Sequence, residues 1–273
     1  MIAVNGVSKV FGRREAEALV LAGQGATKAE ILAATGATLA LRDVTLDIPD
    51  GGICVLMGLS GSGKSTLVRH LNRLVEPSSG EIVVDGRDIR GLDAKALREF
   101  RRQQVSMVFQ GFGLLPHLNV LDNVAFGLVA RGESRVEAHG KARDWLHKVG
   151  LDGYEEARIE ALSGGMKQRV GLARALAVDT GIVLMDEAFS ALDPLIRADM
   201  QDLLQDLQRT LRKTVVFVTH DLAEAVRLGD TVVMLRDGEV VQVGTPEDIL
   251  QRPADDYVAR FVRTLDRIET LRR

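Results

Sequence analysis

Short apolar runs alternate with amphipathic segments along most of this chain. Runs rich in β-branched and other apolar residues predict five strands, at residues 39–48, 53–58, 105–109, 182–186 and 214–219. Apolar positions at helical spacing predict helices between them, at residues 65–75, 166–177 and 199–211. Strands that are apolar on both faces and alternate with helices favour a largely parallel sheet, covered by helices on both sides.

Three other segments depart from this alternation. Asp237-Gly238 joins two alternating runs, which predicts a β-hairpin near the C-terminus. The strand-like opening at residues 1–12 and the run at 39–48 predict an antiparallel β appendage. Residues 111–164 contain no convincing strand, so we expect them to form a helical insertion in the α/β core.

The segment GATKAEILAATG, residues 25–36, has boundaries of its own. Thr27 and Glu30 form a capping-box pattern that begins a helix, and Gly36 stands where a helix ends in the left-handed region. We expect this helix to dock on the β-rich part of the chain through Ile31 and Leu32. Its residues are explained by capping and packing, so the segment predicts no catalytic role.

The composition excludes several classes of protein. The chain has 273 residues, of which 46% are hydrophobic and 27% charged, as in ordinary globular proteins. Its formal net charge of −3 gives no field that favours a nucleic acid, so we expect no nucleic-acid partner. No apolar run approaches the length of a membrane span, and the N-terminus has no secretory pattern. With a single cysteine, Cys54, we expect a soluble, cytosolic protein.

Residues 58–66 read GLSGSGKST and lie between an apolar strand and a helical segment. This is the phosphate-binding pattern G-x-x-x-x-G-K-[ST] in its strand–loop–helix context. Glycines allow backbone N–H groups to turn inward around a phosphate, the lysine reaches the β- and γ-phosphates, and the first hydroxyl ligates Mg²⁺. The pattern predicts a site for ATP and Mg²⁺ formed by Gly58, Ser60, Gly61, Ser62, Gly63, Lys64, Ser65 and Thr66.

Two acids and a histidine follow later apolar strands. Asp186 ends the run IVLMD and is placed to hold Mg²⁺, while Glu187 can polarise a water for in-line attack on the γ-phosphate. His220 follows the strand TVVFVT and can hydrogen-bond the γ-phosphate or orient the water. We therefore expect Glu187, His220 and Lys64 to be the catalytic residues.

LSGGMKQRVGLARAL at residues 162–176 is the most specific string in the chain. Together with GLSGSGKST, Gln110, IVLMDEAFSALDP and His220, in this order, it strongly resembles the ATP-binding subunit of an ABC transporter. The resemblance covers residues 1–262 and leaves 263–273 as a C-terminal tail. It implies a P-loop NTPase (RecA-like) α/β core with an antiparallel β-subdomain and an inserted α-helical subdomain at about residues 111–164.

The resemblance also implies roles for residues that no physical pattern assigns. Ser163, Gly164 and Gly165 match the signature motif, which contacts the γ-phosphate of ATP held by the opposite subunit. Gln110 matches the glutamine that touches Mg²⁺ and reports the nucleotide state to the membrane partner. Residues 190–193, which end in Asp193, match the loop that crosses the dimer interface. The aromatic Phe11 is expected to stack on adenine. Ser65, Gln110 and Asp186 are expected at the metal.

The resemblance implies partners as well. Two copies would hold two ATP molecules head to tail, on the cytoplasmic face of the cell membrane, against separate integral-membrane permease subunits and indirectly a substrate-binding protein. Residues 111–121, GFGLLPHLNVL, lie where the family docks a permease helix. The insert at 25–36 is similar to that of glycine betaine/proline betaine importers, here expected as a short form without the paired CBS domains of many members.

Three other functions stay open from the sequence. The same ATPase could serve the uptake of histidine, choline or another amino acid, because the ATPase never touches the solute. A non-transport ABC ATPase of translation or DNA repair is disfavoured, since such proteins join two nucleotide domains or insert a long coiled coil. A regulatory module that binds ATP without hydrolysis is disfavoured by the presence of Glu187 and His220.

Overall fold

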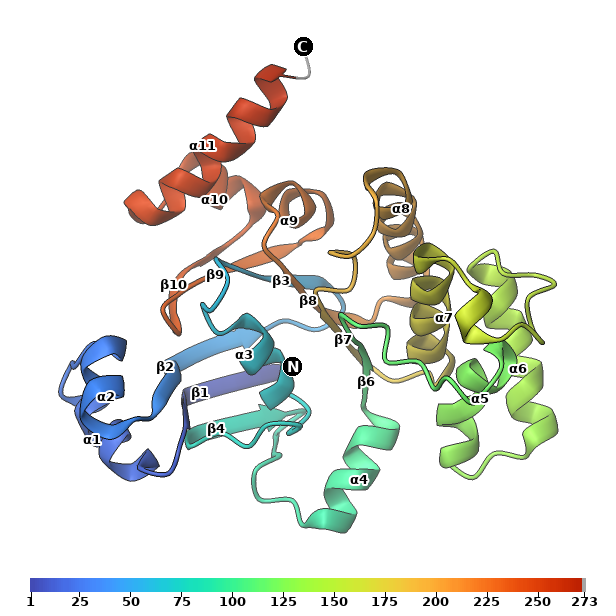
Figure 1. Ribbon diagram of the computed structural model, residues 1–273, viewed down its shortest axis with the longest axis horizontal. Coiled ribbons are helices and arrows are strands. Elements are labelled where there is room, and N and C mark those ends of the chain that lie inside the picture. Colours follow the sequence, from blue (N-terminus) through green and yellow to red (C-terminus); the bar gives the residue numbers. More distant parts are fainter. Residues whose placement is uncertain (272–273) are drawn as a thin grey trace. The chain divides into compact units, whose positions relative to one another are not determined.

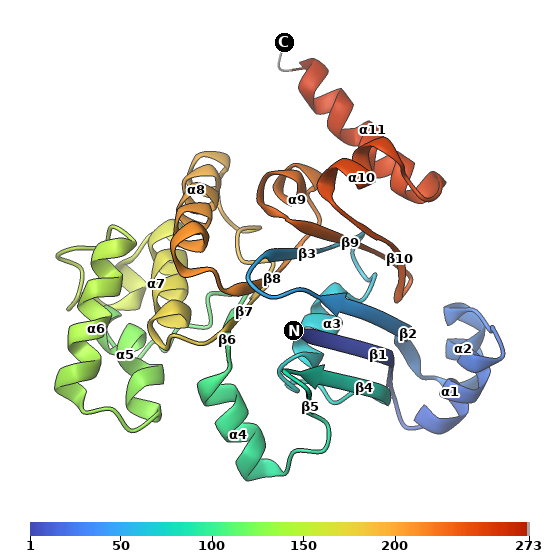
Figure 2. The same cartoon turned by 180° about the vertical axis from the view of Figure 1, so that it is seen from behind.

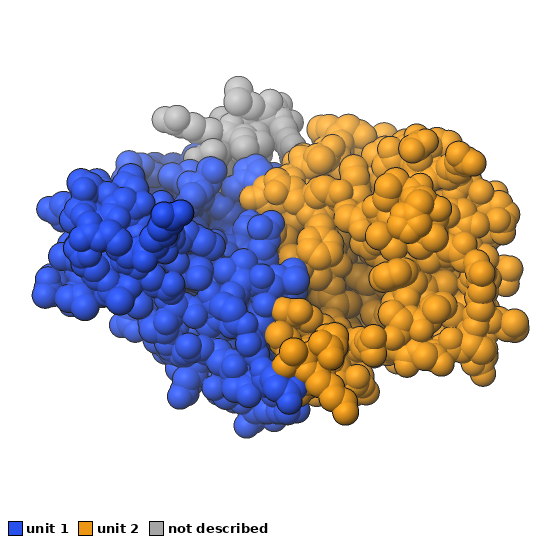
Figure 3. Space-filling model, turned by 60° about the horizontal axis from the view of Figure 1, so that its bottom comes forward, with its two compact units in different colours: residues 1–93, 218–273 blue, residues 94–217 orange. Residues whose placement is uncertain are grey.

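The structure is a computed structural model that describes residues 1–271, with side chains described as far as residue 263. The chain divides into two compact units, one formed by residues 1–93 and 218–273 and the other by residues 94–217 (Figure 3). The boundary at residue 218 falls within strand β8, Thr214–Thr219. Among the described residues, no helix has the length and apolar character needed to cross a bilayer.

The first unit contains an antiparallel sheet with the strand order β2-β1-β4-β5 (Figure 1). Its strands are β1 (Ile2–Phe11), β2 (Thr38–Ile48), β4 (Ser79–Val84) and β5 (Arg87–Asp88). Ile2 lies opposite Ile48 on one side and Val84 on the other, so alternate apolar residues of β1 face one core. The antiparallel appendage predicted from residues 1–12 and 39–48 is present, with two further strands.

Two helices connect β1 to β2, namely α1 (Glu15–Gly23) and α2 (Lys28–Thr35). The predicted capping box is formed, since the Glu30 N–H donates to the Thr27 hydroxyl and Glu30 accepts from the Thr27 N–H, and Gly36 ends α2 at φ 68°. Ile31 is buried in a cluster with Val10 and Leu39 of the sheet. Leu32 is 51% exposed, so its predicted docking role is wrong. One turn of helix separates residues that share a face, and Thr35 takes the buried position beside Ile31.

The described part of the first unit also contains the strands β3, β9 and β10 and four helices. Strand β3 (Ile53–Met57) pairs in parallel with β9 (Thr231–Arg236), and β9 forms the predicted hairpin with β10 (Glu239–Gly244). The helices are α3 (Lys64–His70), α9 (Leu222–Leu228), α10 (Pro246–Gln251) and α11 (Asp256–Leu271). The last two residues of the expected tail 263–273 lie outside the described residues.

Helix α3 is shorter than the predicted helix at 65–75. Arg73 adopts φ 53°, a left-handed conformation that a continuing helix cannot contain. Its guanidinium instead donates to the carbonyls of Ile89 and Leu92. A contact distant in the sequence therefore ends the helix that the local periodicity would extend.

The second unit contains the parallel pair β6 (Val105–Val108) and β7 (Ile182–Asp186), in which Val105 lies opposite Ile182. Its helices are α4 (Ala94–Gln103), α5 (Val120–Ala130), α6 (Arg135–Lys148), the 3₁₀ turn Ile159–Ala161, α7 (Gly164–Ala177) and α8 (Pro194–Leu211). Helices α5, α6 and α7 pack together (Figure 2). Residues 111–164 are all described and contain no strand. Helices α7 and α8 begin earlier than predicted because Ser163 and Asp193 cap them.

Candidate nucleotide site

The loop at residues 58–66 follows β3, whose five residues are all buried. Gly58, Gly61 and Gly63 have φ values of 152°, 79° and 104°, a region that residues with a side chain rarely adopt. Ser60 and Gly61 are exposed on the loop, and Ser65 and Thr66 begin α3 half-buried. The loop thus has the backbone path and the hydroxyl groups that the sequence pattern predicts.

Neighbouring backbone supports the loop from its inner side. A Cβ atom at Gly63 would lie 2.6 Å from Leu41 Cδ2 and 2.9 Å from the Ala40 carbonyl oxygen. The Gly238 N–H, in the turn of the β9–β10 hairpin, donates to the Ser62 carbonyl over 3.0 Å. Glycine is therefore required at 63 by close packing as well as by φ, and the hairpin turn holds the loop in place.

Lys64 is only 4% exposed, and its side chain turns back on the loop. Its Nζ donates to the Gly58 carbonyl over 2.9 Å and to the Leu59 carbonyl over 3.0 Å. An ammonium group this deeply buried is stabilised by such bonds, since a buried charge without partners is very costly. The positive charge is thereby held at the loop that the sequence assigns to phosphates.

In the second unit, Asp186 ends strand β7 and Glu187 follows it. Asp186 is fully buried, while Glu187 has φ 46°, the left-handed conformation, and is half-buried. Gln110, which follows β6, donates from Nε2 to Glu187 Oε2 over 3.1 Å. Gln110 and Glu187 are therefore in contact at the ends of adjacent parallel strands, although they are 77 positions apart and were predicted from separate motifs.

Ser190 holds the main chain that follows Glu187. Its hydroxyl donates to the Glu187 carbonyl over 2.9 Å, and its N–H donates to the same oxygen over 3.2 Å. A non-glycine residue at positive φ is costly and persists where its surroundings hold it. The turn at 187–190 is such a support for the conformation of Glu187.

The signature residues form an exposed helix start. Ser163 caps α7 by accepting a hydrogen bond from the Met166 N–H, and Ser163 and Gly164 are both exposed. Asp193 caps α8 in the same way, through the Ile196 N–H, and is exposed too. Each residue has a structural role as a cap. Capping leaves open the role at a partner's nucleotide that the family resemblance implies.

Phe11 and His220 belong to the first unit. Phe11 ends β1 with 44% of its surface exposed, and Lys9 Nζ lies 5.0 Å from its ring centre. His220 is exposed between β8 and α9, next to the cap residue Asp221. Both residues are thus exposed to solvent.

Several residues that support these loops were not expected there from the sequence. Gly238 braces the loop from a distant hairpin, and Tyr257, on α11, accepts a hydrogen bond from the Leu59 N–H over 3.2 Å. In the second unit, Arg174 donates to the Gly113 carbonyl over 2.8 Å, and burial lowers the pKa of its guanidinium. Gly238 was expected only as part of a hairpin turn and Arg174 only as part of the string at residues 162–176, because their contacts form only in the folded chain.

Comparison with known proteins agrees with this geometry. The family model for ABC transporter matches residues 41–190, more than half of the chain. The chain therefore belongs to the ABC transporter family.

Curated relatives cover almost the whole of this chain. The glycine betaine transport ATP-binding protein of Bacillus subtilis is 53% identical over 97% of this chain. The trimethylamine N-oxide transport system ATP-binding protein of Ruegeria pomeroyi is 48% identical over 98% of the chain. The chain spans 63% of the length of the first relative and 78% of the second.

Solved structures confirm the predicted fold class. A bacterial ABC transporter cassette solved as a dimer matches with a TM-score of 0.77 and 33% identity, over 90% of this chain and 99% of that one. The same cassette in a post-hydrolysis state with ADP and Pi matches at 32% identity. The P-loop NTPase fold is thus shown by sequence and structure together.

Proposed function

We propose that this chain is the ATP-hydrolysing subunit of an importer that takes up glycine betaine, proline betaine or a related quaternary amine. The observation that carries hydrolysis is Glu187, which stands at the end of a buried strand in a supported left-handed conformation and accepts a hydrogen bond from Gln110. A carboxylate in this position can polarise a water, which accelerates a reaction by about 10²–10⁴-fold. The relatives' printed names support the choice of solute.

ATP and Mg²⁺ fit the residues present. The loop at 58–66 offers backbone amides and the Lys64 ammonium to the phosphates. Oxygen donors from Ser65, Gln110 and Asp186 are of the hard type that Mg²⁺ prefers. Bound with the nucleotide, the metal would neutralise charge on the β- and γ-phosphates. His220 is proposed to hydrogen-bond the γ-phosphate, and Phe11 to stack on adenine.

A homodimer is supported by the exposure of the signature residues. Ser163, Gly164 and Asp193 are exposed, with Gly165 next to them half-buried. A similar cassette was solved as a dimer. We propose that each copy places its signature residues on the nucleotide of the other, and that hydrolysis lets the two copies part.

The permease is proposed to bind the second unit. A cavity of about 340 Å³ there is lined by Phe109, Leu115, Phe126 and Arg174, among others. Phe126 is 50% exposed, and an apolar group of this kind at a hollow is typical of a docking site. Binding there would hold the chain at the cytoplasmic face of the membrane, with a substrate-binding protein as an indirect partner.

The choice of solute rests on relatives rather than on the site. A relative from Bacillus subtilis that is named for choline transport is 41% identical over 83% of this chain, so choline is the second candidate. Co-purification of the chain with its permease and binding protein, followed by binding of glycine betaine, choline and histidine to the latter, would separate the candidates.

Glu187→Gln tests the proposed hydrolysis. We expect ATP turnover by the dimer to fall at least a hundredfold, because an amide cannot act as the base, while MgATP binding and the ATP-bound dimer persist. The measurements are phosphate release and size-exclusion chromatography with MgATP. Glu81→Gln, an exposed change on β4, is the matched control. Unchanged turnover in Glu187→Gln would contradict the assignment.

A further inference from the structure

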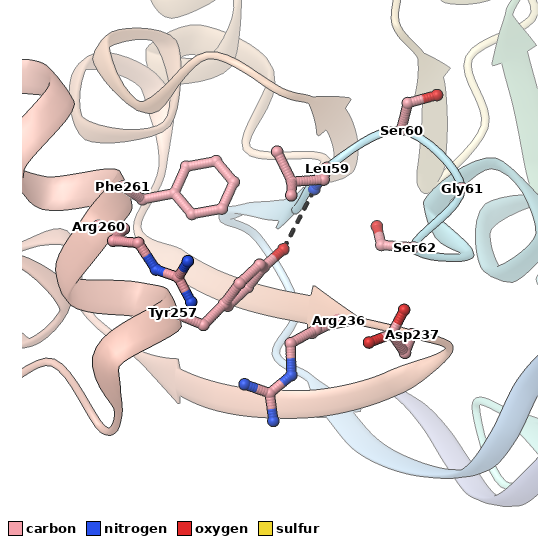
Figure 4. Close-up of a pocket in the computed structure, with 9 residues that line it drawn as sticks. All are labelled: Leu59, Ser60, Gly61, Ser62, Arg236, Asp237, Tyr257, Arg260 and Phe261. Carbon is pink, nitrogen blue, oxygen red and sulfur yellow. Dashed lines mark hydrogen bonds between the residues drawn. The ribbon is translucent and has the colours of Figure 1, made fainter. Parts of the chain in front are cut away.

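Tyr257 connects the C-terminal helix α11 to the start of the phosphate loop. Its side chain is 7% exposed and lies between two neighbours, the Phe261 ring at 5.2 Å and the Arg236 guanidinium at 5.3 Å. Figure 4 shows its hydroxyl pointing at the Leu59 N–H, on the wall of a cavity of about 430 Å³ that Ser60 and Ser62 also line. The phenol ring is therefore held from its own helix and aimed at the loop.

The hydroxyl occupies a place in the sheet ladder. Strands β3 and β9 run in parallel register as far as Met57 opposite Met234. One residue further, Gly58 approaches so closely that a Cβ there would lie 2.2 Å from the Leu235 carbonyl oxygen. A continued ladder would bond the Leu59 N–H to this same oxygen.

The chain leaves the sheet at this point, and Tyr257 takes the place of the missing ladder bond. Its hydroxyl accepts from the Leu59 N–H over 3.2 Å and donates to the Leu235 carbonyl over 3.0 Å. A phenol keeps its proton at neutral pH, and burial raises the pKa of Tyr257 further, so the hydroxyl can act as a donor. Both functions of the hydroxyl are used, and the loop begins at a fixed distance from β9.

The bonded N–H belongs to the same peptide group as a carbonyl that holds Lys64. The Gly58 C=O and the Leu59 N–H are parts of one planar unit, so they cannot rotate independently. The carbonyl accepts from Lys64 Nζ over 2.9 Å while the N–H donates to Tyr257. An unpaired N–H at this place would leave the peptide free to turn and to carry its carbonyl away from the lysine.

We propose that Tyr257 is a positioning residue for nucleotide binding, which sets the orientation of the Gly58–Leu59 peptide and through it the Lys64 ammonium. The proposal rests on the proposed role of the loop at 58–66 as the phosphate site. It gives α11 a part in nucleotide affinity, although the helix follows the loop by nearly 200 residues. Any force that moves the start of α11 is transmitted to the phosphate loop through one hydroxyl.

The test is Tyr257→Phe in the full chain, which keeps the ring contacts and removes only the hydroxyl. The other tyrosine, Tyr154, is 45% exposed in the second unit, so Tyr154→Phe is the matched control. Tyr257→Phe removes both hydrogen bonds of the hydroxyl and leaves the Leu59 N–H without its acceptor. We therefore expect an MgATP affinity that is roughly threefold to tenfold weaker in Tyr257→Phe and unchanged in Tyr154→Phe. Adenosine, which has no phosphate, should bind both variants equally.

A double variant distinguishes positioning from a general loss of structure. Because Tyr257 acts through Lys64, Tyr257→Phe should weaken MgATP binding much less in a Lys64→Ala background than in the wild type. A lowered melting temperature with unchanged MgATP affinity, or equal effects in both backgrounds, would overturn the proposal. If Lys64→Ala alone binds MgATP normally, the loop assignment fails instead, so the two failures are distinguishable.

Discussion

The two motifs that we propose to bind phosphate, the loop at 58–66 and the signature residues 163–165, are built in opposite ways. The loop is enclosed by its own unit: Lys64 is buried, Gly63 packs against β2, and the Gly238 and Tyr257 contacts hold its backbone. The signature begins a helix in the open, where Ser163 and Gly164 are exposed and a Cβ at Gly164 would meet no heavy atom within 4 Å.

The difference fits the proposal that each motif supplies a different half of the nucleotide site. A loop that is braced on several sides is ready to bind a nucleotide within one copy of the chain. An exposed helix start has no enclosing groups of its own, so it binds a nucleotide only together with a second surface. This agrees with the proposal that it contacts the nucleotide of the other copy. Changes in the loop should therefore act on folding and affinity, and changes in the signature on the dimer.

The largest expected difference is between two glycine substitutions. Gly63→Ala should lower the free energy of unfolding by about 2–4 kcal/mol, because the methyl group overlaps Leu41 and the backbone has φ 104°. Gly164→Ala should leave the stability unchanged or raise it slightly, since alanine favours a helix. Urea denaturation measures both. Equal losses in the two variants would show that the loop is no more constrained than the signature.

Lys64→Ala is expected to weaken MgATP binding by roughly tenfold to a hundredfold, the value of charged hydrogen bonds. A fluorescent ATP analogue measures the affinity in the isolated chain, without need of a dimer. Lys95→Ala, an exposed change on α4, is the control and should bind normally.

In the signature, Ser163→Ala should leave this affinity unaltered while lowering dimer turnover. A large loss of affinity in Ser163→Ala would contradict the division of roles.

A smaller effect depends on pH and involves His70 at the end of α3. Burial lowers the pKa of His70 to about 4, its Nδ1 lies 2.8 Å from the Val75 carbonyl, and its buried Nε2 has no hydrogen-bond partner among the described residues. Lys9 lowers this pKa further and Glu76 raises it. The unfolded chain takes up a proton near the ordinary pKa of 6.5, which the folded chain resists. The stability is therefore complete above pH 6.5 and is lost as the pH falls towards 4.

The free energy of unfolding should fall by about 2–3 kcal/mol between pH 6.5 and pH 4, measured by urea denaturation at several pH values. His70→Gln should remove this part of the pH dependence, whereas His147→Gln, at an exposed position on α6, should keep it. If the free energy of unfolding falls equally with pH in the wild type and in His70→Gln, protonation of His70 is not the cause of the loss.

Much of the fold was predictable because its strands and caps are local features. Strands β7 and β8 match the predicted ranges, and the capping box of Thr27 and Glu30 forms as expected. The docking role predicted for Leu32 was wrong, since the sequence does not show which side of a helix packs against the sheet. The end of α3 was missed for a similar reason, because Arg73 bonds carbonyls 16 and 19 residues further along the chain.

The candidate site divides in the same manner. The order of residue types in GLSGSGKST, LSGGMKQ and MDEAFSALDP is sufficient to predict the chemistry, because phosphates and Mg²⁺ require glycines, hydroxyls and acids at set spacings. What holds these residues was decided only by the tertiary structure. Gly238 contacts the loop from a hairpin turn and Tyr257 from helix α11, both far along the chain, and Gln110 contacts Glu187 across the ends of adjacent strands. These bonds join groups that only the folded chain brings together: the Gly238 and Tyr257 contacts pair backbone groups of the loop, and Gln110 and Glu187 pair two side chains.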